Sequence, residues 1–399
     1  MARFRTLDTL EVRNKIVLLR ADLNVPMKDG NVTDTTRLVR IIPTLQDLTQ
    51  KGARVVILSH LGRPKGQHNP DYSLRPVAQA LETLWKAPIA FAEDCIGPKA
   101  QEAIDALKPG NLLVLENTRF YEGEEKNDPV FAQKLADLGD VFVHDAFSTA
   151  HRAHASTEGL ARLLPCAAGR LMEAELNALE RALGNPEHPV AALVGGSKIS
   201  TKIELLQNLI SRVDVLALGG GMANTFLAAQ GLNVGRSLYE ADMLETARTI
   251  AATAEARGCQ ILLPEDAVVA ESLENNIATR TVPVQALPPD MMILDIGPQS
   301  IKKIGEALSR CKTVVWNGPL GAFETKPFDE ATSAVAQIVS HLTKKKEILS
   351  VAGGGDTVAA LTHAGVVDDL SYVSTAGGAF LEWMEGKTLP GVAALEAAA

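Results

Sequence analysis

Short runs of apolar residues alternate along this chain with longer stretches in which apolar residues recur every three or four positions. A short apolar run predicts a β-strand, and the longer periodic pattern predicts an amphipathic helix. Their alternation is typical of βα units, which build parallel sheets. The predicted strands are residues 15–19, 54–58, 112–115, 141–143, 190–194, 213–218, 261–263, 292–294, 313–316 and 347–351. Helices are predicted at residues 76–85, 130–138 and 203–210, the last of them capped by Ser200 or Thr201.

The best candidate for a domain boundary is residues 184–189, where Gly and Pro interrupt the alternation. Residues 171–183, just before it, carry leucines near one face and predict a single helix. Such a helix is either a stiff connector between domains or an ordinary surface helix, and the sequence leaves both open. The length of 399 residues corresponds to two or three domains of about 150 residues each, and we expect two.

Composition excludes several classes of protein. Hydrophobic residues make up 46% of the chain and charged residues 22%, which predicts a globular protein with a sizeable core. The net charge of -9 argues against a nucleic-acid partner, although a local basic patch can still bind a small anion. No apolar run reaches the ~18 residues of a membrane span, and no signal-peptide core follows the first residues. We therefore expect a soluble cytoplasmic protein.

The four cysteines are widely spread and have no zinc-like spacing. They are expected to be small buried side chains.

In the first half of the chain, every predicted strand is followed by Arg or His. Ligands bind beyond the carboxyl ends of parallel strands, so these side chains should meet at one edge of a sheet. Arg is suited to carboxylate and phosphate oxygens, and Asp22 and Asn24 can bind a hydroxyl group. The sequence therefore predicts a small phosphorylated hydroxy acid as ligand. The residues concerned are Arg20, Asp22, Asn24, Arg37, His60, Arg63, Arg119, His144 and Arg152.

Two other interpretations apply to polar residues of this half. His144, Asp145, His151 and His154 could form a metal site, although their spacing matches no standard zinc pattern. The acidic run at residues 122–126 is expected to be a solvated loop.

In the second half, five predicted turns are rich in glycine, at residues 194–198, 218–222, 316–321, 352–357 and 374–378. Glycine lets the backbone approach a ligand closely, and the N–H groups that start a helix bind phosphate. A single turn of this kind is weak evidence, but five favour a nucleotide pocket. The chain contains neither a G-x-x-x-x-G-K-[ST] nor a G-x-G-x-x-G motif.

Charged residues near these turns suit the same ligand. Lys198 and Lys202 are four residues apart and share a face if the segment is helical, so both could bind phosphates. Asp356 follows three glycines and could hold Mg²⁺ between phosphate oxygens.

Seven segments, in chain order, resemble the motifs of the phosphoglycerate kinase family, so the resemblance covers the whole chain. They are residues 17–26 (VLLRADLNVP), 60–64 (HLGRP), 116–120 (ENTRF), 150–154 (AHRAH), 195–198 (GGSK), 316–319 (WNGP) and 353–356 (GGGD).

The resemblance implies an α/β fold with two doubly wound parallel-sheet (Rossmann-like) domains joined by a helical hinge. The glycerate-binding domain would span residues 1–170, with the C-terminal tail, about 386–399, returning to it. The hinge helix would be residues 171–185 and the nucleotide-binding domain residues 186–385.

The implied activity is reversible phosphoryl transfer between 1,3-bisphosphoglycerate plus ADP and 3-phosphoglycerate plus ATP, in glycolysis and gluconeogenesis. Transfer would be direct and in line, with domain closure. Mg²⁺ would accompany ATP or ADP, with no permanently bound cofactor. The implied partners are these small molecules, not nucleic acid or membrane, and the family is usually monomeric.

The resemblance also implies roles for individual residues. The glycerate would be bound by Asp22, Asn24, Arg37, His60, Arg63, Arg119 and Arg152. The nucleotide would be bound by Gly196, Lys198, Lys202, Gly220, Asn317, Pro319, Glu324, Gly353, Gly354, Gly355, Asp356 and Thr357, with Asp356 at the metal. Charge on the transferring phosphoryl group would be neutralised by Arg37, Lys198 and the amides around Gly355 and Gly378.

The chain departs from the family pattern at two positions. Ser148 and Ala376 stand where the family usually has glycine. If position 376 needs a positive φ, alanine costs about 1 kcal/mol or more; if it only needs a small residue, the change is nearly silent.

Two rival functions remain. An NAD-dependent dehydrogenase would be expected to carry the dinucleotide motif that this chain does not contain. A non-catalytic two-domain protein that closes on an anion would need neither the paired lysines nor the glycine turns.

Overall fold

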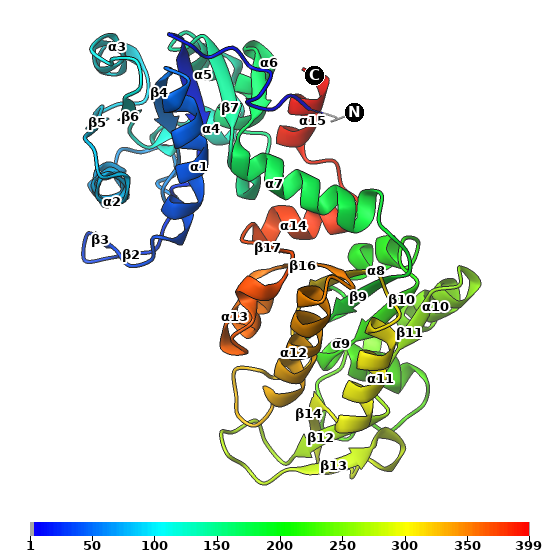
Figure 1. Ribbon diagram of the computed structural model, residues 1–399. Helices are drawn as coiled ribbons and strands as arrows, with labels where there is room; N and C mark the ends of the chain where they lie inside the picture. The colour runs from blue at the N-terminus through cyan, green and yellow to red at the C-terminus, as the bar shows by residue number, and fades with distance from the viewer. Residues whose placement is uncertain (1–3, 399) are drawn as a thin grey trace. The chain divides into compact units, whose positions relative to one another are not determined.

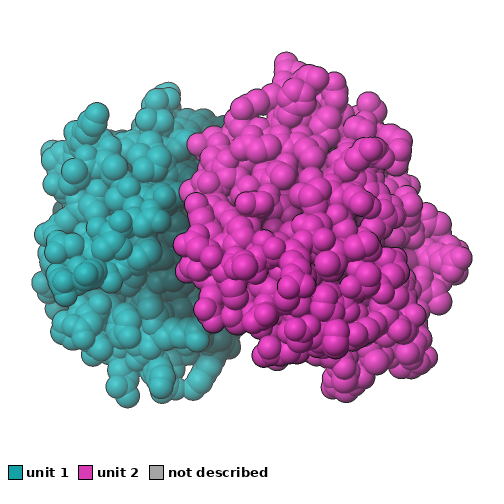
Figure 2. Space-filling view, turned by 90° about the horizontal axis from the view of Figure 1, so that it is seen from below, with its two compact units in different colours: residues 1–176, 388–399 teal, residues 177–387 magenta. Residues whose placement is uncertain are grey.

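The structure, a computed structural model, describes residues 4–398 and divides into two compact units (Figure 1). Unit 1 comprises the described residues up to Leu176 together with those from Thr388 onward, and unit 2 runs from Asn177 to Lys387. Figure 2 colours unit 1 teal and unit 2 magenta. Unit 1 is therefore discontinuous in sequence, because the chain leaves it, builds unit 2 and then returns to it.

Unit 1 is built on a parallel sheet with the strand order β5-β6-β4-β1-β7-β8. The strands after β1 add first on one side of it and then on the other, so the switch point of the topology lies at β1. Ligands bind at such a point, beyond the carboxyl ends of the strands. The strands are β1 (Ile16–Arg20), β4 (Arg54–Leu58), β5 (Ile89–Phe91), β6 (Leu112–Val114), β7 (Val141–His144) and β8 (Cys166–Ala168). A short antiparallel pair, β2 (Met27–Lys28) and β3 (Asn31–Val32), stands apart.

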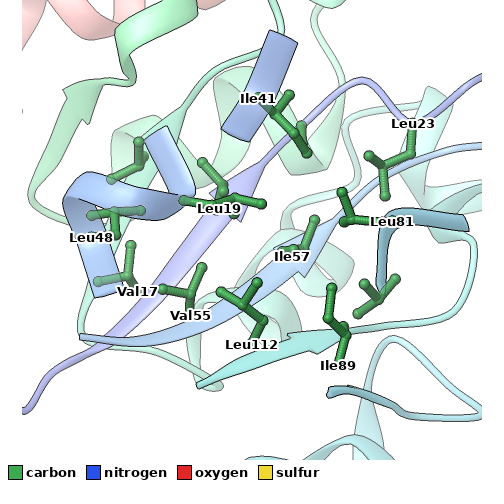
Figure 3. Packing of buried hydrophobic residues seen from close by; sticks show 14 of the residues in the cluster. Val17, Leu19, Leu23, Ile41, Leu48, Val55, Ile57, Leu81, Ile89 and Leu112 are labelled. Carbon is green, nitrogen blue, oxygen red and sulfur yellow. The ribbon is translucent and has the colours of Figure 1, made fainter. Parts of the chain in front are cut away.

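The helices of unit 1 cover a core made by alternate residues of the strands. Figure 3 shows Val17 and Leu19 of β1 in one buried cluster with Ile41 and Leu48 of α1. Burial on both faces explains why the strand sequences are continuous apolar runs. The helices are α1 (Thr36–Gln50), α2 (Arg75–Trp85), α3 (Gly97–Asp105), α4 (Glu122–Glu125), α5 (Pro129–Ala136), α6 (Leu160–Leu163), α7 (Arg170–Leu179) and α15 (Pro390–Ala397).

Unit 2 has a second parallel sheet, with the order β11-β10-β9-β15-β16-β17. Its strands are β9 (Val190–Val194), β10 (Val215–Leu218), β11 (Gln260–Leu262), β15 (Thr313–Asn317), β16 (Leu349–Gly353) and β17 (Tyr372–Ser374). Its helices are α8 (Ile203–Leu209), α9 (Gly220–Ala229), α10 (Leu244–Ala256), α11 (Pro298–Leu308), α12 (Glu330–Lys344), α13 (Gly355–His363) and α14 (Gly377–Met384). Two doubly wound sheets, with a C-terminal tail returning to the first unit, confirm the expected fold class.

One strand prediction needs correction. The strand predicted at 292–294 is not part of the parallel sheet, because β14 (Met292–Ile296) pairs antiparallel with β12 (Asp266–Ala270). With β13 (Arg280–Pro283) these strands form a separate small sheet. It has its own apolar cluster, which includes Ala267 and Val269 of β12.

The predicted helix at 171–183 is a continuous helical segment. α7 continues into a π-helical turn, Glu180–Gly184, and the boundary between the units falls inside α7, after Leu176. Its first residues are tied to unit 1, since Arg170 N donates to Thr44 Oγ1 (2.9 Å) and Met172 N to Asp145 Oδ1 (3.0 Å).

At the other end of the chain, α15 packs on unit 1, where Gly391 N donates to Ala150 O (2.9 Å). The four cysteines are buried free thiols, as expected. Within residues 4–398, no helix has both the length and the apolar character that crossing a membrane requires.

Candidate active site

Three predicted residues of unit 1 meet where the first strand ends. Arg37, near the start of α1, places Nη1 2.8 Å from Asp22 Oδ2 and donates to Asn24 O (2.8 Å). The side chain of Asn24 accepts a hydrogen bond from Gly62 N (2.9 Å), which joins the loop after β1 to the loop after β4. The loops that follow neighbouring strands therefore form one surface at the edge of the sheet, as the sequence predicted.

Two basic side chains beside this surface are almost completely buried. Arg119 is 4% exposed and donates to Gly62 O (2.8 Å), while His60 is 5% exposed. Burial lowers the pKa of Arg119, and burial together with the charge of Arg20 lowers the pKa of His60 well below its usual range. Arg119 Nε lies 3.2 Å from Oε1 of Glu125, an exposed residue that partly balances its charge. Its guanidinium group still suits an anionic ligand, because burial has removed much of its water. Of the other predicted arginines, Arg63 is exposed and Arg152 is half-buried.

Ser148, one of the two departures from the family pattern, belongs to this surface. Its hydroxyl donates to Asp22 Oδ2 (2.5 Å), the same oxygen that faces Arg37. Asp22 Oδ1 accepts from Asn24 N (3.0 Å), so the carboxylate is held on both oxygens. The substitution therefore adds a hydrogen bond at a predicted substrate residue.

Glu124 contradicts the expectation that residues 122–126 form a solvated loop. Its side chain is fully buried and accepts from Ser156 N (3.0 Å) and Ser156 Oγ (2.5 Å). Glu122, Glu125 and Lys126 are exposed, as expected, but residues 122–125 form the short helix α4 and not a loop. The sequence of residues 122–126 does not indicate that Glu124 is the buried member. Its carboxylate is stabilised by hydrogen bonds from Ser156, which is 32 positions away in sequence.

The metal interpretation of His144, Asp145, His151 and His154 is wrong. No group of three His, Cys, Asp or Glu side chains in residues 4–398 is arranged to hold a metal ion. His144 is instead a buried neutral ring, since burial lowers its pKa to about 3.

Unit 2 contains a cavity of about 690 Å³, within the usual size range of small-molecule sites. Five predicted nucleotide residues line it: Gly196, Gly220, Pro319, Glu324 and Asp356. Much of the remaining wall is apolar, with side chains from the strand β14 and the loops around it: Leu238, Leu273, Met292, Leu294 and Phe323. An apolar slot beside glycine turns suits a flat base with phosphates attached.

The glycine turns also pack tightly on one another. A Cβ at Gly195 would lie 1.7 Å from Pro319 O, so no side chain fits there. Gly354 has φ +98°, and its Cβ position lies 2.9 Å from Asn317 Nδ2. Gly195 and Gly354 are therefore needed because a side chain at either position would collide with a neighbouring loop.

Asn317 connects three of these loops from a buried position. Its Oδ1 accepts from Lys202 Nζ (2.7 Å) and its Nδ2 donates to Gly353 O (3.0 Å). In the same region, Gly318 N donates to Thr357 Oγ1 (2.7 Å). Asn317 and Thr357 thus hold the loops in place around the cavity.

Lys202 occupies the N-cap position of α8, and no side chain caps that helix. The prediction that Ser200 or Thr201 is the cap is therefore wrong: Ser200 Oγ donates to Glu240 and Thr201 Oγ1 to Lys198 O. Lys202 Nζ donates to Gly195 O (2.7 Å), and burial lowers its pKa to about 8.

The remaining predicted residues lie at the starts of helices. Gly355 and Asp356 begin α13, Gly378 is in the first turn of α14, and all three are exposed, as is Lys198. Ala376 has φ −97°, so this position does not need the positive φ considered above.

Residues 7–387 match the family model described as phosphoglycerate kinase. This chain belongs to the phosphoglycerate kinase family. A phosphoglycerate kinase from Ruegeria sp. (strain TM1040) is 60% identical to it over 393 residues, covering 98% of this chain and 99% of that protein. One from Rhodospirillum centenum is 60% identical over 394 residues, covering 99% of this chain and 100% of that protein.

Solved structures of the phosphoglycerate kinase family have the same fold. The chain aligns with the phosphoglycerate kinase from Coxiella burnetii at a TM-score of 0.92 and 44% identity, covering 98% of each chain. The enzyme from Pyrococcus horikoshii OT3 aligns at a TM-score of 0.81 and 31% identity, covering 99% of each chain.

Membership of the phosphoglycerate kinase family confirms the resemblance noted in the sequence and makes the chain a phosphotransferase that acts on a carboxyl group. The dehydrogenase and the non-catalytic binding protein are therefore excluded.

Proposed function

We propose that this chain transfers a phosphoryl group reversibly between 1,3-bisphosphoglycerate plus ADP and 3-phosphoglycerate plus ATP. The observation that supports this most strongly is the 690 Å³ cavity, which has an apolar wall, glycine turns and Asp356. A cluster of cations around a carboxylate and an amide, as in unit 1, suits a phosphorylated hydroxy acid.

Unit 1 is assigned the glycerate. Asp22 and Asn24 bind its hydroxyl and carboxylate end, and Arg37 lies near the transferred group. Three arginines and a histidine complete the anion site: Arg63, Arg119, Arg152 and His60.

Unit 2 is assigned the nucleotide. Lys202 reaches its phosphates, Lys198 follows the phosphoryl group during transfer, and Pro319, Glu324 and Gly220 line the base and ribose. The N–H groups at the start of α13 suit phosphate oxygens. The other assigned residues support the phosphate loops: Gly196, Asn317, Gly353, Gly354, Gly355 and Thr357.

Asp356 is assigned to Mg²⁺, which enters with the nucleotide. One exposed carboxylate that lines the cavity fits this ion, because Mg²⁺ is commonly held by one or two carboxylates together with substrate phosphates. When bound, the ion neutralises phosphate charge.

The chemistry needs no general base. In the direction that consumes ATP, the acceptor is a carboxylate, which is already ionised at neutral pH. Catalysis then consists of positioning and charge stabilisation. Arg37, Lys198 and the amides around Gly355 and Gly378 supply that charge. Because water would hydrolyse the group in transit, the two units close over their substrates before transfer, and residues 171–185 serve as the hinge.

The proposal includes a monomer that works in the cytoplasm on small molecules, with no nucleic-acid or membrane partner. The absence of a net positive charge is consistent with this.

The test is ATP-dependent formation of an acyl phosphate from 3-phosphoglycerate with Mg²⁺, trapped by hydroxylamine. Parent protein should form the trapped product, and Lys198→Ala should lose most of the rate. Lys345→Ala, which changes an exposed lysine at the end of α12, is the matched control and should keep the parent rate. A parent that binds both substrates but forms no product would contradict the proposal, and an active Lys198→Ala would remove Lys198 from the transfer step.

A further inference from the structure

Arg20 is the last residue of β1, and its side chain is fully buried in contact with His60. Its Nη2 lies 3.1 Å from His60 Nδ1. A guanidinium group has five N–H donors and no acceptor, so the histidine nitrogen in this hydrogen bond must offer a lone pair. The ring is then neutral, and its proton is on Nε2.

Arg20 is fixed in this orientation by its other hydrogen bonds. Its Nη1 donates to Ala21 O (2.5 Å) and its Nε donates to Ser156 Oγ (2.7 Å). Ser156 in turn donates twice to Glu124, whose buried carboxylate balances the arginine charge. The arginine therefore cannot turn away from His60 without leaving buried donors unpaired.

The surroundings of His60 also oppose a second ring proton. After burial, the strongest influences on the ring come from four groups: Arg20, Arg119, His154 and Arg37. Each of them is a cation or a histidine. Burial and these charges lower the pKa of His60 well below its usual range.

We propose that Arg20 is a positioning residue that keeps His60 neutral with its proton on Nε2, so that His60 offers an anionic substrate a directed hydrogen bond. The proposal rests on the function proposed above, which assigns the glycerate to this site. In this arrangement the arginines supply the positive charge of the site. His60 Nε2 donates a hydrogen bond to one oxygen of the substrate. Its contribution should not change between pH 6 and pH 8.

The first experiment is ¹⁵N NMR of the free protein labelled at histidine. The chain has eight histidines, so the His60 signals are assigned by their absence in His60→Gln. The expected spectrum shows a protonated Nε2 and an unprotonated Nδ1 throughout pH 6 to 8. A ring protonated on Nδ1, or on both nitrogens, would overturn the proposal. Because no substrate is present, this result does not depend on whether the proposed reaction is correct.

The second experiment tests whether Arg20 is the cause. In Arg20→Gln the amide can donate or accept, and the charge is lost, so the ring should show both tautomers and titrate closer to its usual range. KM for 3-phosphoglycerate should rise about tenfold, as expected for loss of one hydrogen bond to an anion, with a smaller change in kcat. Arg20→Lys keeps a donor and a charge, and should keep the Nε2 proton. An unchanged His60 spectrum in a folded Arg20→Gln would refute the role of Arg20.

A third comparison does not require Arg20 to be changed. In His60→Gln the amide nitrogen takes the place of Nε2, whereas in His60→Asn it takes the place of Nδ1. His60→Gln should bind 3-phosphoglycerate about tenfold more tightly than His60→Asn. The reverse order would overturn the assignment of the proton to Nε2.

Discussion

The affinity of the protein for ADP should fall as the pH rises above 8, because Lys202 then loses its proton. Its Nζ is buried against Gly195 O and Asn317 Oδ1, and burial lowers its pKa to about 8, with the nearby charge of Asp356 acting in the opposite sense. Only the protonated amine attracts phosphate. Above pH 8 the free protein is mostly deprotonated at this position, so binding must take up a proton first.

The magnitude follows from that pKa. A group that titrates at about 8 in the free protein, and is protonated in the complex, weakens apparent binding about tenfold between pH 7 and pH 9. A lysine with the ordinary pKa of about 10.4 would leave affinity almost unchanged over this range.

Isothermal titration calorimetry with ADP at pH 7, 8 and 9, in buffers of different ionisation enthalpy, measures both the affinity and the proton uptake. Lys202→Arg is the matched control, because arginine stays charged at all these values. It also corrects for ionisation of the nucleotide, which affects both proteins equally. Equal pH dependence in the two proteins, without proton uptake in the parent, would refute the reasoning.

Three further substitutions test features of the two sites. Ser148→Ala removes the hydrogen bond to Asp22 and should lower kcat/KM for 3-phosphoglycerate roughly tenfold, or about 1.5 kcal/mol; an unchanged value would show that the bond has no role. Ala376→Gly should destabilise the protein to urea by about 0.5–1 kcal/mol, since φ is negative there, and a more stable variant would contradict this. Gly195→Ala should lower Tm by several degrees and abolish ADP binding, because its Cβ would meet Pro319 O; normal binding would show that the loops can separate.

Much of the fold could be predicted because buried parallel strands are continuous apolar runs. Residues 54–58 and 190–194 were predicted with the same limits as β4 and β9. Strands β5, β8 and β17 have three residues each and were not predicted, whereas the equally short β6 and β11 were. The antiparallel partner of β14 could not be predicted, since an apolar run does not indicate which strand it will pair with.

The sequence identifies site residues where the residue type and its place after a strand are enough to indicate a binding role. Asp22 and Asn24 follow from the rule that strand ends meet at one edge of a sheet, and Arg37 joins them from the start of α1. The burial of Glu124 does not, because its partner Ser156 is 32 positions away in sequence. Nor does the hydrogen bond that Lys202 donates to Asn317, because these residues are 115 positions apart in sequence.

The return of α15 to unit 1 has a consequence for biosynthesis. A ribosome synthesises unit 2, which is continuous from Asn177 to Lys387, between the two segments of unit 1. Domains tend to fold as they emerge, so the first part of unit 1 can begin to fold long before it gains the helix that Gly391 joins to Ala150. The folding of unit 1 therefore depends on a segment that is synthesised only after the whole of unit 2.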